Sequence, residues 1–135
     1  MTIELEPIGV VASPLRHVDD APRQPDEGAP AARLLLDPSV RDGLVGLSPG
    51  DRAVVITWLD QAERDLLTVH PRGDEARPAQ GVFSTRSPHR PNPIGLHDVM
   101  IVEVRGSEVH VAQLDAVEGT PILDIKPALD VVDRR

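Results

Sequence analysis

Short apolar runs separated by glycine, proline and aspartate recur about every ten residues along the chain. This pattern is typical of a small all-β domain. The runs 99–105 and 108–114 flank Gly106 and Ser107, and a two-residue connection of this kind favours a β-hairpin. We expect strands at residues 3–12, 31–36, 52–59, 66–69, 80–84, 99–105, 108–114 and 122–125.

One short helix is expected at residues 38–45. Asp37 suits the N-cap position, Pro38 suits the first helical position, and Gly46 follows the last residue. A chain of 135 residues is expected to form a single domain, residues 1–135. A small antiparallel β-barrel with one short helix and long ligand-binding loops accommodates these elements and leaves few exposed strand edges.

The stretch 14–30 is predicted to be a long loop. It contains Pro22, Pro25, Gly28 and six charged residues, and it shows no periodicity. Long loops in compact domains are usually functional or disordered, so this segment is a candidate part of a binding site.

The stretch 81–96 has an unusual composition for a segment between two strands. Three prolines between residues 88 and 93 fix three φ angles and remove three amide donors, which excludes a helix interior or a central strand. Arg90 and Asn92 add polar groups, and Gly95 allows close approach of the backbone. A stiff loop loses little entropy on binding, so we expect it to hold a polar ligand. A PxxP ligand for an SH3 domain is a rival interpretation, which the flanking apolar strands disfavour.

Composition excludes several kinds of site. The absence of cysteine excludes disulfides, zinc thiolates and thiol nucleophiles, and the five histidines show no HxH or HxxxH pairing, so no metal site is expected. No apolar run approaches the about 20 residues that span a bilayer, and the first residues do not resemble a signal peptide. We therefore expect a cytoplasmic protein with no membrane partner.

The charge distribution is uneven. A net charge of −8 argues against strong non-specific binding of nucleic acid. Residues 70–92, in contrast, carry four arginines against two carboxylates, a local net charge of +2. We call this segment the basic island.

Residues 85–96 read Thr-Arg-Ser-Pro-His-Arg-Pro-Asn-Pro-Ile-Gly-Leu, and this run resembles the signature of the TrmO family, also called TsaA-like or YaeB-like. Further matches follow in the family's order: Ile-Gly-Val at 8–10, Pro-Arg-Gln at 22–24, Asp115 with Gly-Thr-Pro at 119–121, and Leu-Asp-Ile-Lys-Pro at 123–127. Together they cover most of the chain.

The resemblance implies a β-barrel methyltransferase that uses S-adenosyl-L-methionine. The family's named activity is N-methylation of threonylcarbamoyl-adenosine beside the tRNA anticodon. Family members pair two chains so that both border the pocket, which implies a homodimer. Carried over by motif, the cofactor-binding residues are Pro22, Arg23, Gln24, Asp60, Gln61, Arg86, Leu96, Asp115, Ala116, Val117, Glu118 and Gly119. The substrate-binding candidates are Arg90, Asn92, Asp124 and Lys126.

Each site residue also has an ordinary structural interpretation. Arg86 and Arg90 are alternatively surface or clamping arginines, and Asn92 alternatively caps its own turn. The i, i+2 spacing of Asp124 and Lys126 places them on one strand face, where an ion pair at the barrel floor is the alternative to catalysis. Asp115, Glu118 and Asp124 are alternatively solvated carboxylates.

Two further positions complete this set. Gly95 is either a point of close approach to a ligand or a bulge at the barrel rim. His70 is the histidine most suited to a pocket role, with a satisfied, partly buried histidine as the alternative. No residue is a convincing general base.

The methyl acceptor stays open at this stage. Modified adenosine in tRNA is one hypothesis. The acidic composition and the scarcity of aromatic residues for base stacking favour a small molecule or peptide instead. A third hypothesis is a non-catalytic protein that binds S-adenosyl-L-methionine.

Overall fold

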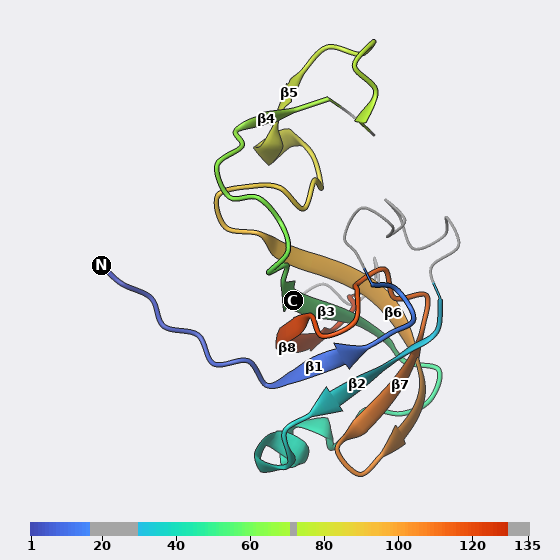
Figure 1. The fold of residues 1–135 in the computed structure, drawn as a ribbon. Helices are drawn as coiled ribbons and strands as arrows, with labels where there is room; N and C mark the ends of the chain where they lie inside the picture. Colours follow the sequence, from blue (N-terminus) through green and yellow to red (C-terminus); the bar gives the residue numbers. More distant parts are fainter. Residues whose placement is uncertain (17–29, 71–72, 130–135) are drawn as a thin grey trace.

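The chain folds into a closed antiparallel β-barrel in the strand order β1-β2-β7-β6-β3-β8 (Figure 1). The computed structural model describes residues 1–16, 30–70 and 73–129. The barrel strands are β1 (Gly9–Ala12), β2 (Ala32–Leu36), β3 (Arg52–Trp58), β6 (Ile94–Arg105), β7 (Glu108–Ala112) and β8 (Pro121–Pro127). The predicted all-β barrel is confirmed.

Buried and exposed residues alternate along the strands, and the buried residues form the core. In β6 every second side chain from Gly95 to Ile101 is buried, and the positions between them are exposed. This period of two places one set of side chains inside the barrel and the other on its surface. The interior is filled mainly by branched aliphatic residues, among them Val11, Leu34, Val55, Val99, Ile101, Val109, Val111, Leu114 and Ile122.

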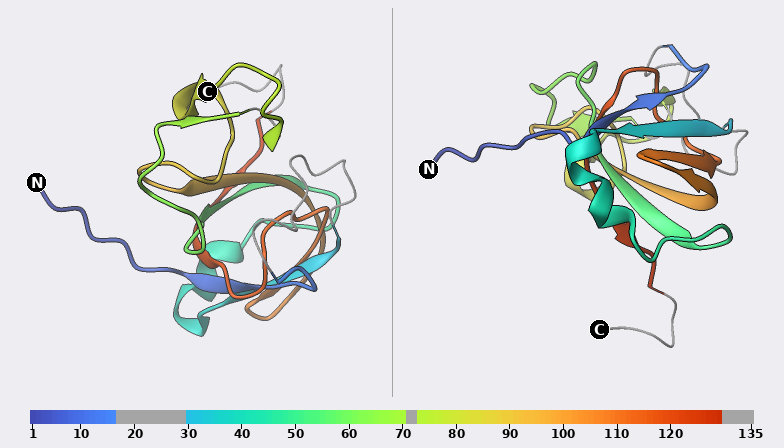
Figure 2. Two further views of the ribbon diagram at one scale, coloured as in Figure 1. Left: turned by 45° about the horizontal axis from the view of Figure 1, so that its top comes forward. Right: turned by 90° about the horizontal axis from the view of Figure 1, so that it is seen from below.

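The structure corrects several strand boundaries, and the largest changes are at the starts of β6 and β1. β6 begins at Ile94, five residues before the predicted start, because Ile94 to Val99 pair with β3 in unbroken register. β1 begins only at Gly9, since pairing with β2 and β8 starts there, and the preceding residues run away from the barrel (Figures 1 and 2). The predicted hairpin at Gly106 and Ser107 is confirmed by the pairing of Arg105 with Glu108.

The predicted short helix is the 3-10 helix η3 (Pro38–Leu44). Its N-cap is Asp37, whose Oδ1 accepts a hydrogen bond from the Ser39 amide at 2.9 Å. This backbone hydrogen bond is the main reason that the pKa of Asp37 lies below its usual value.

The segment between β3 and β6 leaves the barrel and forms a small hairpin of its own (Figure 1). It contains β4 (Thr68–Val69) and β5 (Gln80–Gly81), followed by the 3-10 helix η5 (Val82–Ser84). The strand predicted at 80–84 is therefore only two residues long. Within the described parts of the chain, no helix is long and apolar enough to cross a membrane.

Candidate functional site

A small hollow lies where the end of β3 meets the turn before β8. It is lined by Leu59, Asp60, Gln61, Asp115, Ala116, Val117 and Thr120, and we call it the Asp115 hollow. Five of these seven are predicted cofactor-binding residues, brought together from segments more than fifty positions apart in the sequence.

Backbone hydrogen bonds fix the turn that forms one wall of this hollow. The Gly119 amide donates to the Val11 carbonyl at 2.7 Å, and the Glu118 amide donates to the Leu15 carbonyl at 2.7 Å. Gly119 has a φ angle of 79°, a conformation that glycine adopts at no steric cost. The turn therefore presents Asp115, Ala116 and Val117 to the hollow in a defined position.

Behind the hollow, three polar side chains form a hydrogen-bonded chain inside the barrel. Asp115 Oδ1 lies 2.5 Å from His97 Nδ1, and His97 Nε2 lies 2.7 Å from Thr57 Oγ1. An ionised carboxylate only accepts hydrogen bonds, so His97 Nδ1 carries the proton and donates to Asp115. In the neutral ring, Nε2 then accepts from the Thr57 hydroxyl. Thr57 and His97 are buried, and the Asp115 side chain keeps 14% of its surface exposed.

Gly95 leaves the space that this chain of hydrogen bonds needs. It lies in β6 opposite Thr57, and a Cβ atom at this position would stand 2.5 Å from Thr57 Oγ1 and 2.7 Å from His97 Nε2. The register through Gly95 is continuous, so the alternative interpretation of a bulge at the barrel rim is wrong. The close approach at this glycine is made by two side chains of the barrel.

The proline-rich loop is held by hydrogen bonds to the segment after β3. Arg90 donates through Nη2 to the carbonyls of Val82 and Thr85, the latter at 2.7 Å, and its own amide donates to the Glu63 carbonyl. The clamping interpretation of Arg90 thus has direct support. Its buried Nε has no partner among the residues that the structure describes.

A second arginine, Arg64, holds the same loop from the outside. Its Nε donates to the Pro91 carbonyl at 2.7 Å, and its Nη2 donates to Asn92 Oδ1 at 3.0 Å. The guanidinium also lies over the Trp58 ring, 5.0 Å from the ring centre. Asn92 therefore has a structural partner, whereas its expected contact with substrate stays a prediction.

Arg86 and Leu96 lie outside the Asp115 hollow. Arg86 is exposed, and within the described segments it forms no hydrogen bond or ion pair. Leu96 is 50% exposed on the outer face of β6. It pairs with Ile56 of β3, and Ile56 pairs in turn with Asp124 of β8. Leu96 and Asp124 therefore share the outer face of the barrel, with one strand between them.

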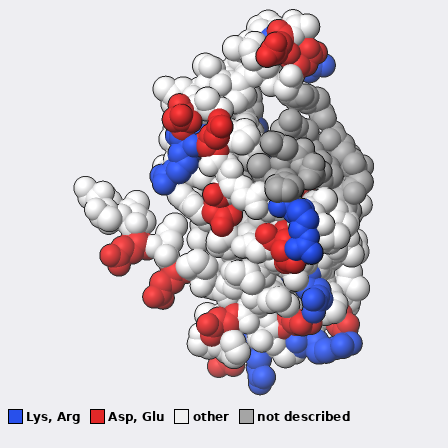
Figure 3. All heavy atoms as spheres, viewed as in Figure 1, with Lys and Arg blue, Asp and Glu red and all other residues white. Residues whose placement is uncertain are grey.

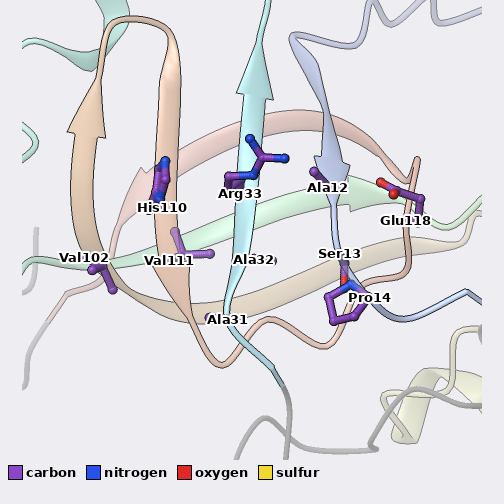
Figure 4. Close-up of a pocket in the computed structure, with 10 residues that line it drawn as sticks. All are labelled: Ala12, Ser13, Pro14, Ala31, Ala32, Arg33, Val102, His110, Val111 and Glu118. Carbon is purple, nitrogen blue, oxygen red and sulfur yellow. The ribbon is translucent and has the colours of Figure 1, made fainter.

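Glu118 belongs to a different, open hollow of about 410 Å³ between β1, β2 and β7 (Figure 4). Its carboxylate lies 3.3 Å from Arg16 Nη1. Arg33 and His110 lie on the same wall, and both contact Glu108. The hydrogen bond from His110 is the main reason that the pKa of Glu108 is lowered.

Asp124 and Lys126 share one face of β8, as predicted, with Nζ 3.5 Å from Oδ2. Their side chains are 51% and 65% exposed, so the pair lies on the outer face of the barrel. The alternative interpretation, an ion pair at the barrel floor, is wrong in its position, because the buried residues of β3 and β8 are Ala53, Val55, Thr57 and Ile122.

Two arginines of the basic island are already engaged by neighbouring groups. Arg77 pairs with Asp74 at 3.7 Å, and Arg90 is committed to backbone carbonyls. On the face shown in Figure 3, acidic and basic side chains are interspersed. His70 is exposed, with its Nδ1 2.9 Å from the Arg77 carbonyl oxygen, so the expected partial burial is wrong, and this histidine lines neither hollow.

Part of the predicted cofactor site, namely Pro22, Arg23 and Gln24, lies outside the described residues. Among residues 1–16, 30–70 and 73–129, no group of three or more potential metal ligands occurs.

Sequence reasoning missed His97, Thr57 and Arg64. The signal for His97 was its position two residues after Gly95 in an alternating run that continues to Ile101. Extending the strand to Ile94 identifies His97 as an inward-facing position.

Comparisons with known proteins agree with this architecture. The family model for the tRNA-methyltransferase O N-terminal domain matches residues 10–134. An Archaeoglobus fulgidus protein named S-adenosyl-L-methionine-binding protein is 42% identical over 96% of this chain and 94% of its own length. A longer protein of that organism, named as a probable S-adenosyl-L-methionine-binding protein, is 40% identical over 98% of this chain but only 36% of its own length.

Two solved structures are similar throughout. A crystal structure of TrmO from Pseudomonas aeruginosa has a TM-score of 0.78 and 30% identity, and another crystal structure of TrmO has a TM-score of 0.77 and 33% identity. All of this chain is covered in both comparisons. It spans 61% and 63% of the two solved chains.

Proposed function

The chain belongs to the tRNA-methyltransferase O N-terminal domain family, and from this membership we propose that it binds S-adenosyl-L-methionine and transfers the methyl group to an acceptor. One observation carries the proposal: the Asp115 hollow collects five residues that the family resemblance assigned to the cofactor. They come from two distant parts of the sequence, and their meeting is a consequence of the fold.

The chemistry of the hollow fits this cofactor. Ala116, Val117 and Leu59 supply apolar groups at this hollow of about 20 Å³, and Asp115 and Asp60 supply carboxylate oxygens. Carboxylates accept hydrogen bonds from ribose hydroxyls and from an ammonium group, and they favour a nearby positive charge. Asp60, Gln61, Asp115, Ala116 and Val117 are therefore the residues that would hold the cofactor.

When bound, the cofactor supplies an electrophilic methyl group on a cationic sulfur. The contribution of the protein is binding, orientation and exclusion of water, which can account for a large part of the rate of a displacement reaction. Arg90 and Arg64 support this role, since they hold the proline-rich loop rigid beside the end of β3.

For the acceptor, we favour threonylcarbamoyl-adenosine next to the tRNA anticodon, because the signature run from Thr85 to Leu96 is intact apart from His89, where the family usually has an apolar residue. A cytoplasmic location follows from such a substrate. Arg90, Asn92, Asp124 and Lys126 stay predicted substrate contacts. A small-molecule or peptide acceptor is supported by the net charge of −8 and by the interspersed charges of Figure 3. The names of the relatives also fit a protein that only binds the cofactor.

We also propose a homodimer with the pocket near the interface. The outward-facing positions of β6 include Ile94, Leu96, Met100 and Val102, which are 42–52% exposed. Exposed apolar residues gathered on one strand suit a protein interface, although the exposed Asp98 lies between Leu96 and Met100. Only one strand separates it from Asp124, a predicted substrate contact.

The decisive experiment has two parts. Calorimetry in the presence of a chelator should show saturable binding of S-adenosyl-L-methionine and of its demethylated product, and no heat with either ligand would refute the cofactor assignment. Mass spectrometry of anticodon-loop nucleosides from cells with and without the protein should then show the methylated nucleoside only when the protein is present. If nucleosides are unchanged while the cofactor binds, the tRNA acceptor is refuted alone.

A further inference from the structure

Most of the polar side chains buried in the barrel lie at or behind the Asp115 hollow. Among the described residues that are buried, the polar ones are Ser13, Thr57, His97 and Thr120, and His97 is the only titratable residue of this set. An imidazole placed in such an interior needs partners for both ring nitrogens, because a buried polar atom without a hydrogen bond is costly. Thr57 and Asp115 provide them.

The chain of hydrogen bonds has one closed end and one open end. At the closed end, Thr57 is fully buried and contacts only the interior. At the open end, Asp115 lines the hollow, and within the described part of the chain only its Oδ1 has a hydrogen-bond partner. The second oxygen, Oδ2, is therefore available to a molecule that enters the hollow.

A simple filling of the barrel does not require this arrangement. Well-packed apolar side chains fill a core at no greater cost than a buried polar network, which stabilises only if every member is satisfied. Position 95 is a glycine, and a Cβ atom there would displace Thr57 Oγ1 and His97 Nε2. Three positions on two strands are thus adapted to hold one carboxylate.

We propose that His97 is a positioning residue for cofactor binding, because it fixes the Asp115 carboxylate with Oδ1 bound to the ring and Oδ2 directed to the ligand. The inference rests on the proposed function, since it assumes that the Asp115 hollow receives S-adenosyl-L-methionine. In metal sites, replacing a residue that orients a ligand-binding side chain typically changes affinity or activity by ten- to hundredfold, and we expect an effect of this kind here. Thr57 in turn positions the His97 ring through its hydrogen bond to Nε2.

Affinity for S-adenosylhomocysteine, the demethylated product, measures this role without catalysis. In calorimetry we expect His97→Gln to weaken binding roughly tenfold or more. Val99→Ala is the matched control: Val99 is the next inward-facing residue of β6, it is buried, and its apolar side chain forms no hydrogen bond with the three polar side chains. It should lower the thermal stability of the barrel while leaving affinity unchanged in the folded protein.

A double-mutant cycle distinguishes positioning from general destabilisation. If His97 acts through Asp115, His97→Gln should have no further effect on affinity in an Asp115→Asn background. Equal weakening in both backgrounds, or unchanged affinity of the single variant, would overturn the inference. If His97→Gln does not fold, Thr57→Val in the same cycle gives the same test, with a smaller expected loss.

The wild-type measurement separates the two proposals. Absence of binding by the wild type would overturn the proposed function and this inference together. Binding by the wild type with no loss in His97→Gln would overturn this inference alone.

Discussion

Arg64 donates a hydrogen bond to the side-chain oxygen of Asn92 at 3.0 Å, across 28 positions of sequence. The same guanidinium donates to the Pro91 carbonyl and lies over the Trp58 ring. Three prolines stiffen the loop locally but supply no amide donors. The loop is therefore attached through its other groups, such as the Arg90 amide that donates to the Glu63 carbonyl, and through donors from elsewhere such as Arg64.

We therefore expect Arg64→Ala to loosen the proline-rich loop while leaving the barrel folded. Loss of hydrogen bonds to a charged donor should make local opening roughly tenfold or more frequent. Hydrogen exchange of the Arg90 and Ile94 amides, which bond to Glu63 and Asn92 carbonyls, reports this opening directly. Arg41→Ala, an exposed arginine of η3, should leave both amides unchanged. Exchange at the wild-type rate in Arg64→Ala would refute the role of Arg64 as a clamp.

The attachment of this loop shows what the sequence can and cannot specify. Proline content predicts the loop itself, because it acts through local backbone geometry. The partner Arg64 lies in a segment with no distinctive pattern, and its contact with Asn92 depends on where β3 and β6 end in space. For the same reason, the i, i+2 spacing correctly predicts that Asp124 and Lys126 share one face of their strand. It does not predict that this face is the outer face of the barrel.

The candidate site shows the same division. The family motif identified Asp115, Ala116 and Val117, because these residues are consecutive and a sequence motif can include all three. His97 was missed because the prolines before it led to a strand start at Val99, which hid the alternation from Gly95 onward. The pairing of Thr57 with Gly95 joins residues 38 positions apart, and only the closed barrel makes it evident.

Gly95→Ala is expected to destabilise the protein by about 1–3 kcal/mol, as overpacking of a core does. The added Cβ would meet Thr57 Oγ1 and His97 Nε2 at distances below van der Waals contact, and both atoms are buried and hydrogen-bonded. Chemical denaturation measures the change. Gly43→Ala is the control, since nothing lies within 4 Å of a Cβ at Gly43 and its φ angle is not positive. Equal stability of the two variants would show that the space at Gly95 is not required.

The N-cap of η3 should make a measurable contribution to acid sensitivity. The pKa of Asp37 is lowered chiefly by the Ser39 amide, so the folded-state pKa lies below the unfolded value of about 3.9. The stabilisation is fully present above the unfolded pKa and is lost as pH falls through the folded pKa. Denaturation of the wild type and of Asp37→Asn between neutral pH and about pH 3 should show a difference in stability that shrinks at the acid end. A pH-independent difference for Asp37→Asn would contradict the role of the charge.

Arg86→Ala should weaken cofactor binding without affecting the fold. The residue is exposed and, in the described segments, makes no hydrogen bond that holds the structure together. Loss of a charge-assisted interaction with a ligand costs about 1.5–3 kcal/mol, which corresponds to roughly tenfold to more than a hundredfold in affinity. Calorimetry with S-adenosyl-L-methionine gives the affinity, and a thermal melt verifies the fold. Normal binding together with a much lower melting temperature would identify Arg86 as a structural residue instead.

The last prediction separates a tRNA acceptor from a small molecule, and it follows from the contrast between the net charge of −8 and the basic island. If tRNA is the acceptor, phosphates must meet the few cations of residues 70–92, so binding should weaken steeply as salt increases. Reversing the charge of both Arg72 and Arg77 should then reduce tRNA methylation, and the slope of log K against log salt should fall by about one for each phosphate that no longer has a cationic partner. Cofactor affinity should stay unchanged, because the family resemblance assigns neither arginine to the cofactor.

The control for this experiment is Arg41→Glu on η3, which lies at the opposite end of the molecule from the β4–β5 hairpin (Figure 1). It changes the net charge of the protein in the same direction without altering the basic island, so it isolates the local effect from the overall repulsion of an acidic protein. Full tRNA methylation after both reversals would refute docking through the basic island. A protein that binds the cofactor but methylates no tRNA at any salt concentration would instead favour the small-molecule acceptor, because a compact substrate reaches the hollow without a cationic surface to guide it.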